Sequence, residues 1–222
     1  MNGTRLAIAV LAIGGLAFAA TYLRKDAVSE HRHTRQVILH YTFSRVGQPI
    51  IVLGDSITEA STLPRTLCDH ALVNAGLDGA STASDLGPWL LAALGGQRAA
   101  AILVALGTND GLQGRSQQEF EANYTALLAQ LRGSTDRLVI LGIPAVEVRG
   151  HMPPDYQAAT MRRIDAFNAA LPALAEKNGA AFAALPVMPE THTIDGVHLD
   201  AAGYAVWDAA VLKGASGACS KP

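Results

Sequence analysis

The chain has 222 residues, of which half are hydrophobic and 16% are charged, so it can bury the core of one domain and carry an appendage. Its 17 basic and 19 acidic residues give a net charge of −2, and this lack of a basic field excludes a nucleic-acid-binding protein. Because the sequence contains no Cys-x-x-Cys or His-Glu-x-x-His motif, we expect neither a metal site nor a cofactor.

Residues 1–25 form a segment of their own. The stretch from Leu6 to Leu23 carries no charge, and its 18 residues are just enough to span the hydrocarbon layer of a membrane. A cleaved signal peptide usually has a shorter apolar region, although Ala17-Phe18-Ala19 offers a small-x-small cleavage site. We therefore expect an N-terminal membrane anchor, with a signal segment as the alternative.

The charges that flank this segment give conflicting predictions of its orientation. Arg24, Lys25, Arg32 and Arg35 follow the segment and only Arg5 precedes it, and an excess of positive charge usually stays in the cytoplasm. An apolar N-terminal segment with a short basic start is, in contrast, typical of export. We expect the rest of the chain to be exported or anchored at the inner membrane, on the periplasmic, extracytoplasmic side.

Residues 26–48 are predicted to form a helical stalk or linker, because the stretch from Gln36 to Arg45 is amphipathic and Gly47-Gln48-Pro49 interrupts it. Beyond this break, apolar strand-like segments alternate with helical ones. The predicted strands are 49–53, 71–73, 99–106, 137–143 and 180–185. The predicted helices include 116–131, 156–177 and 201–212, and Pro172 predicts a kink or two shorter helices in the second of these.

The alternation of strands and helices over residues 49–213 indicates one α/β domain. Strands that are apolar throughout are typical of a parallel sheet covered on both faces. We predict a doubly wound, flavodoxin-like three-layer sandwich with a central parallel sheet of about five strands. Ligands of such sheets bind beyond the carboxyl ends of the strands. Ser56, Gly76 and Asn109 all follow the ends of predicted strands.

Residues 214–222 are rich in Gly, Ser and Ala and are predicted to be a loose C-terminal tail. The chain has two cysteines, Cys68 and Cys219, which could pair in an oxidising compartment. Because Cys219 lies in the predicted tail, the sequence favours two unpaired thiols.

Four short motifs carry polar residues suited to acyl transfer. They are Gly54-Asp55-Ser56-Ile57, Asn74-Ala75-Gly76, Gly107-Thr108-Asn109-Asp110 and Asp195-Gly196-Val197-His198. Each motif alone is weak evidence, because a serine that follows a strand is usually a helix cap. In this order the motifs resemble the blocks of the SGNH, or GDSL-type, serine hydrolases, with Ile57 where the family name has Leu. The resemblance extends over residues 49–212 and implies an esterase or acylhydrolase.

A serine hydroxyl needs an adjacent base and an exposed position to act as a nucleophile. Ser56 is the predicted nucleophile and His198 the predicted base. Asp195 precedes His198 by three residues, a spacing that lets its carboxylate fix the tautomer of the imidazole and stabilise the imidazolium. His192, which lies three residues before Asp195, is the alternative base.

The tetrahedral intermediate of acyl transfer carries an oxyanion, which requires preorganised hydrogen-bond donors. The family resemblance assigns this oxyanion hole to the N–H groups of Ser56 and Gly76 and to the side-chain amide of Asn109. Asp55 and Asp110 are expected to brace their loops. The loop 145–156 could shape the substrate pocket or simply connect two elements.

We therefore expect a serine esterase that removes a short acyl group, such as acetyl, through an acyl-enzyme on Ser56. Its expected substrate is a small acyl ester or an acylated carbohydrate of the cell envelope. Two alternatives remain open. The same site could pass the acyl group to a polysaccharide hydroxyl, as an O-acyltransferase, or the domain could be a non-catalytic module that binds glycan or a protein partner.

Overall fold

The computed structural model of the chain describes residues 28–147 and 153–219. The predicted anchor of residues 1–25 lies outside these ranges. Among the helices of the described ranges, none has the length and apolar character needed to cross a membrane. The chain divides into two compact units, Met1–Ile38 and Leu39–Pro222. Residues 28–38 of the first unit are helical, and the helix ends at residue 43.

The second unit is built on one sheet of six strands in the order β2-β3-β1-β4-β5-β6. The strands are β1 (Ile50–Gly54), β2 (Thr66–Leu67), β3 (His70–Gly76), β4 (Ala101–Ala105), β5 (Leu138–Leu141) and β6 (Ala181–Ala183). All neighbouring strands are parallel except β2, which pairs antiparallel with β3. The five parallel strands confirm the predicted fold. The sequence did not predict β2, because a strand of two residues is too short to show an apolar pattern.

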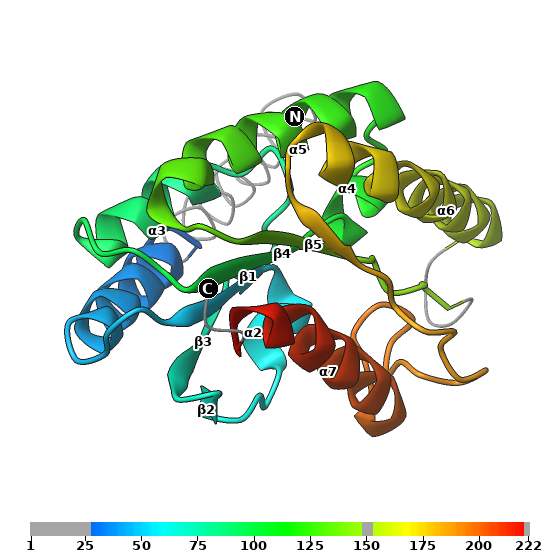
Figure 1. Cartoon of the computed structure of the whole chain (residues 1–222). Coiled ribbons are helices and arrows are strands. Elements are labelled where there is room, and N and C mark those ends of the chain that lie inside the picture. The colour runs from blue at the N-terminus through cyan, green and yellow to red at the C-terminus, as the bar shows by residue number, and fades with distance from the viewer. Residues whose placement is uncertain (1–27, 148–152, 220–222) are drawn as a thin grey trace, which may run out of the picture. The chain divides into compact units, whose positions relative to one another are not determined.

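Helices cover both faces of the sheet (Figure 1). They are α2 (Ser56–Ala60), α3 (Leu86–Leu94), α4 (Thr108–Leu112), α5 (Gln117–Leu131), α6 (Pro154–Lys177) and α7 (Ala201–Ala215), with 3-10 turns η1 (Arg132–Ser134) and η2 (Ser216–Cys219). Ile51 and Leu53 of β1 pack with residues of α3, α5 and α6. Ile50 and Val52 pack on the opposite face with Ile57 of α2 and with α7. Side chains alternate along a strand, so a fully apolar β1 requires both layers.

The start of the second unit differs from the predicted linker. Leu39 and Phe43 are 2% and 1% exposed and belong to the same core as α3 and α5. The last part of the predicted stalk, residues 26–48, is therefore part of the folded domain. The amphipathic pattern from Gln36 to Arg45 arises because one side of this helix is buried.

The helix α6 corrects one alternative from the sequence. It runs without interruption from Pro154 to Lys177, with Pro172 inside it, so the prediction of two shorter helices is wrong. Phe167 and Leu171 before the proline and Leu174 after it are all buried. Packing on both sides of Pro172 therefore outweighs the roughly 3 kcal/mol that a proline costs within a helix.

The C-terminal residues differ most from the sequence-based expectation. Helix α7 continues to Ala215, and η2 extends the ordered chain to Cys219, where the sequence predicted a loose tail. Cys219 forms a disulfide with Cys68, with their Cα atoms 5.2 Å apart, so the prediction of two free thiols is wrong. Leu67 and Ala218, the neighbours of the two cysteines, both pack against the apolar cluster of α7, and this packing brings the sulfurs together.

We predict that Cys219→Ser lowers the free energy of unfolding by about 2–4 kcal/mol, because the cross-link no longer restricts the unfolded chain. Urea unfolding of the oxidised protein and the variant measures the difference. The double variant that also carries Cys68→Ser should be no less stable than the single variant. Alkylation of both cysteines in the native protein without a reductant would contradict the disulfide.

Candidate active site

Three neighbouring strands bring their carboxyl ends to one edge of the sheet. In the parallel register, Gly54 of β1 lies opposite Gly76 of β3 on one side and opposite Ala105 of β4 on the other. The turns that follow these strands therefore start side by side. Ser56 is the first residue of α2, and Asn109 is the second residue of α4. The fold thus places both side chains at the edge where ligands of parallel sheets bind.

A continuous chain of hydrogen bonds links three of the predicted site residues. Ser56 Oγ lies 3.0 Å from His198 Nε2, and His198 Nδ1 lies 2.7 Å from Asp195 Oδ2. The other carboxylate oxygen of Asp195 accepts the N–H groups of Val197 and His198. This geometry lets Asp195 fix the imidazole with Nε2 facing the serine.

The carboxyl group of Asp195 stays ionised beside the imidazole. Partial burial raises its pKa, but hydrogen bonds from the side chain and N–H of His198 and from the N–H of Val197 outweigh this effect, so the pKa lies below its usual value. The side chains of His198 and Asp195 are 41% and 51% exposed. Solvent therefore reaches this end of the hydrogen-bonded chain.

Asp55 caps the helix that begins with Ser56. Its Oδ1 accepts the N–H of Ile57 at 3.0 Å, so the helix cap is Asp55 and not Ser56. Capping therefore does not account for the hydroxyl of Ser56, which faces His198 instead. Burial raises the pKa of the Asp55 carboxyl to about 7, although backbone N–H groups and His198 act in the opposite direction.

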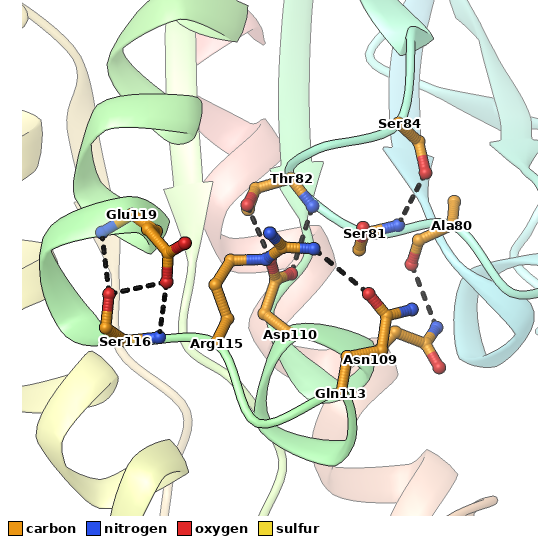
Figure 2. A network of polar contacts seen from close by, with 10 residues as sticks. All are labelled: Ala80, Ser81, Thr82, Ser84, Asn109, Asp110, Gln113, Arg115, Ser116 and Glu119. Atoms are coloured by element: carbon orange, nitrogen blue, oxygen red, sulfur yellow. Dashed lines mark hydrogen bonds and ion pairs between the residues drawn. The ribbon is translucent and has the colours of Figure 1, made fainter.

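The side chain of Asn109 is held by the loop after β3. Its Nδ2 donates one hydrogen to the carbonyl of Ala80 at 2.9 Å, which leaves the second hydrogen of the amide for another acceptor. The next residue, Asp110, is fully buried and accepts hydrogen bonds from Thr82 and Arg115 (Figure 2). Asp110 therefore braces the loops as the sequence predicts, and its contacts fix the position of Asn109.

Gly76 does not fit the role that the family resemblance assigns to it. Its N–H donates to Oδ1 of Asn74 at 2.9 Å and so is already engaged. A Cβ at Gly76 would lie 2.1 Å from the backbone nitrogen of Glu59, so the glycine is required where β3 packs against α2. The structure therefore corrects the assignment of Gly76 to the oxyanion hole, because its N–H is used by Asn74.

A second glycine, in the loop after β3, offers an N–H group that is not engaged in this way. Asp78 lines the candidate pocket, and Gly79 follows it with a φ of +70°, a conformation that favours glycine. Within the described ranges, the Gly79 N–H has no hydrogen-bond acceptor. The turn signal Asp78-Gly79 is visible in the sequence, but the choice between the two glycines depends on the packing of Gly76 against α2.

These residues surround a pocket of about 250 Å³. Four of the residues that line it are predicted site residues: Ser56, Asn109, Asp195 and His198. The remaining wall is formed by Asp78, Thr108, Leu112 and Val197. The lining of this small pocket thus combines apolar side chains with the carboxylates of Asp78 and Asp195.

His192, the alternative base, does not belong to this pocket. It is 5% exposed, and its Nδ1 and Nε2 contact the carbonyl oxygens of Pro189 and Ala145. Of the loop 145–156, residues 148–152 lie outside the described ranges, and Glu147 contacts His192. Among the residues that the structure describes, no group of three His, Cys, Asp or Glu side chains could hold a metal ion.

Comparison with known proteins agrees with this architecture. Residues 52–206 match the model of the GDSL-like lipase/acylhydrolase family. Over 154 residues, the chain is 28% identical to the esterase TesA of Pseudomonas aeruginosa, covering 63% of this chain and 71% of that protein.

Two solved structures share the fold. One is a protein from Streptococcus pneumonia described in connection with platelet activating factor, with a TM-score of 0.69 and 24% identity over 89% of this chain and 98% of that one. The other is a catalytic mutant of Axe2, an acetylxylan esterase from Geobacillus stearothermophilus, with a TM-score of 0.60 and 16% identity over 77% and 94% of the two chains.

The buried carboxyl of Asp55 predicts how stability changes with pH. Its pKa in the folded state, about 7, lies above the value of 3.8 expected for an unfolded chain, so between these values the folded protein holds a proton that the unfolded chain has lost. The contribution of Asp55 to the free energy of unfolding should therefore fall as the pH rises from about 4 to about 7.

Urea unfolding of the wild type and of Asp55→Asn between pH 4 and 8 tests this prediction. The wild type should lose stability relative to the variant over this range. Asp78→Asn, which changes an exposed carboxylate in the same pocket, is the matched control and should show no such trend. A difference between wild type and Asp55→Asn that stays constant with pH would contradict the prediction.

Proposed function

Because the chain belongs to the GDSL-like lipase/acylhydrolase family and is an ester hydrolase, we propose that Ser56 is its nucleophile, His198 its general base and Asp195 the residue that orients the base. The single observation that carries this proposal is the hydrogen-bonded chain from Ser56 through His198 to Asp195. A binding module would have no use for this arrangement, and the proposal therefore sets aside the non-catalytic alternative.

The first half of the proposed reaction forms an acyl-enzyme. Ser56 Oγ attacks the carbonyl carbon of the ester while its proton moves to His198 Nε2, and the electron pair of the carbonyl double bond moves to the oxygen. In the proposal, the N–H of Ser56, the N–H of Gly79 and the amide of Asn109 donate to this oxyanion. The C–O bond then breaks, and the leaving alkoxide takes the proton from His198.

The second half releases the acid. His198 takes a proton from a water molecule, which attacks the carbonyl carbon of the acyl-enzyme, and the collapse of the second intermediate returns the proton to Ser56 Oγ. The half-exposed side chains of His198 and Asp195 give water a route to this step. This exposure favours hydrolysis over the alternative of an O-acyltransferase, which must exclude water while a sugar hydroxyl attacks.

We propose a short acyl group, with acetyl as the first candidate. A pocket of about 250 Å³ leaves little room for a long chain beside the nucleophile, and Leu112 and Val197 supply an apolar wall. The exposed carboxylate of Asp78 at the pocket can accept hydrogen bonds from the hydroxyl groups of a neutral carbohydrate. The similarity to Axe2, named as an acetylxylan esterase, supports acetylated carbohydrate as the substrate class.

We also propose that the domain works outside the cytoplasm, held by the apolar segment from Leu6 to Leu23. Disulfides persist in oxidising compartments and are rare in the cytosol. The pairing of Cys68 with Cys219 therefore supports export, although the positive charges after the segment favour the opposite orientation. An extracytoplasmic position would bring the site to the carbohydrates of the cell envelope.

The nucleophile and oxyanion assignments predict a graded loss of activity. Ser56→Ala should abolish the hydrolysis of p-nitrophenyl acetate, whereas Asn109→Ala should lower kcat by roughly 10²–10³ with a smaller change in KM. Circular dichroism of both variants should match the wild type. Rates on p-nitrophenyl esters of increasing chain length test the acyl preference. Near-normal turnover by a folded Ser56→Ala enzyme would disprove the proposed mechanism.

The proposed location predicts a membrane-bound, full-length protein. Carbonate extraction should leave the protein in the membrane fraction, and its intact mass should include residues 1–25. Protease added to spheroplasts should digest the domain if it faces outward, with a cytoplasmic enzyme as the control. A soluble form that begins near Ala20 would show that the segment is a cleaved signal peptide.

A further inference from the structure

The loop that carries Asp195 and His198 lacks the support that the rest of the site has. Ser56 and Asn109 lie in the first turns of helices that follow strands of the central sheet. Asp195 and His198 instead lie in the long connection between β6 and α7, where the described backbone contains only an isolated bridge between Thr193 and Leu199. Something else must hold this loop at the distance from Ser56 that proton transfer requires.

A buried acidic residue contacts this loop at three points, two through its carboxylate and one through its backbone N–H. Glu147, which follows β5, is 9% exposed. Its Oε1 accepts the N–H of His192 at 2.6 Å, and its Oε2 accepts the hydroxyl of Thr193. The N–H of Glu147 donates to the carbonyl of Gly196 at 2.9 Å. These contacts lie on both sides of Asp195 in the sequence.

The imidazole of His192 completes the contact between the two loops. Its Nδ1 lies 3.0 Å from Glu147 Oε1 and 2.8 Å from the carbonyl of Pro189, and its Nε2 lies 2.9 Å from the carbonyl of Ala145. Carbonyl oxygens only accept hydrogen bonds. The ring of His192 thus links Glu147 to backbone carbonyl oxygens on both sides of it.

Two further hydrogen bonds lie between this pair and the predicted catalytic groups. The hydroxyl of Thr193, which donates to Glu147, accepts the N–H of Gly196 at 3.1 Å. The N–H of Ile194 donates to the carbonyl of His198 at 2.8 Å. The turn that points Asp195 back at His198 is thus closed by the contact between Ile194 and His198 and held by Thr193, which donates to Glu147.

We propose that Glu147 and His192 are positioning residues of this enzyme: their buried pair sets the distance between His198 and Ser56. The proposal rests on the proposed roles of Ser56, His198 and Asp195. Directional hydrogen bonds are suited to this task, because apolar packing would bury the loop without fixing its backbone to within a fraction of an ångström. A misplacement of about 1 Å can cost on the order of 10²-fold in rate.

The test compares Glu147→Gln with Glu190→Gln in the full-length protein. Both variants exchange a carboxylate for an amide of the same size, but Glu190 is exposed on the same loop, so it is the matched control. Glu147→Gln should lower kcat for p-nitrophenyl acetate by roughly 10- to 100-fold with KM within about twofold of the wild type. Thr193→Val should produce a smaller loss of the same kind, and Glu190→Gln none.

Two results would overturn the proposal. One is a Glu147→Gln enzyme with normal kcat, and the other is a loss of kcat that only follows the loss of folded protein in circular dichroism. If Ser56→Ala abolishes turnover in the same assay while Glu147→Gln does not change it, the positioning role fails and the proposed mechanism stands. Activity that persists in Ser56→Ala would instead disprove the mechanism.

A second measurement needs no variant at Glu147. Thr193→Val removes the hydroxyl that donates to Glu147 Oε2, so a normal kcat in this variant would overturn the proposal, even where the Glu147→Gln variant does not fold.

Discussion

The parallel register of β3, β1 and β4 is the constraint on which the site depends. Burial on both faces makes the two central strands, β1 and β4, apolar along their whole length, so neither of them carries a polar side chain. The chemistry therefore has to come from the turns after the strands. Because Gly54 lies level with Gly76 and Ala105, the three turns meet at one edge. The same apolar requirement that builds the core thus also gathers the site.

The sheet brings the turns of the site near one another, and buried carboxylates then fix the positions of these turns. Asp55 holds the first turn of α2, Asp110 ties the turn after β4 to the loop after β3, and Glu147 contacts the loop before α7. Each accepts hydrogen bonds from backbone or side-chain donors that would otherwise be buried without a partner. Among the described residues, the acidic side chains that are buried therefore all lie around the site.

The sequence predicts the parts of the fold and site that depend on local patterns. The apolar strands, the capping box at Ser116 and the four motifs with Ser56, Asn109, Asp195 and His198 are all visible without the structure. Features that depend on contacts between distant segments are not visible. The pairing of Cys68 with Cys219 is one example, because it spans 151 positions and is set by packing on α7.

Two residues show why motif position alone is insufficient. Gly76 matches the expected motif, but its N–H is used by Asn74 and its Cα faces α2, so the nearby Gly79 is the better candidate. His192 has the same spacing to Asp195 as His198 has, on the other side, yet it is buried against Glu147. Neither distinction can be made from the sequence, because each depends on how the loops pack in the folded protein.

The disulfide also sets an order of events during synthesis of the chain. Cys219 follows every strand and helix of the domain, and His198 follows all of the strands. The cross-link can therefore close only after the whole sheet has been made, and a partly synthesised chain has Ser56 without the proposed base. If the proposed roles of Ser56 and His198 hold, a nascent chain carries no competent hydrolase while it is still being made, and the site and the cross-link are both completed by the last segment of the chain.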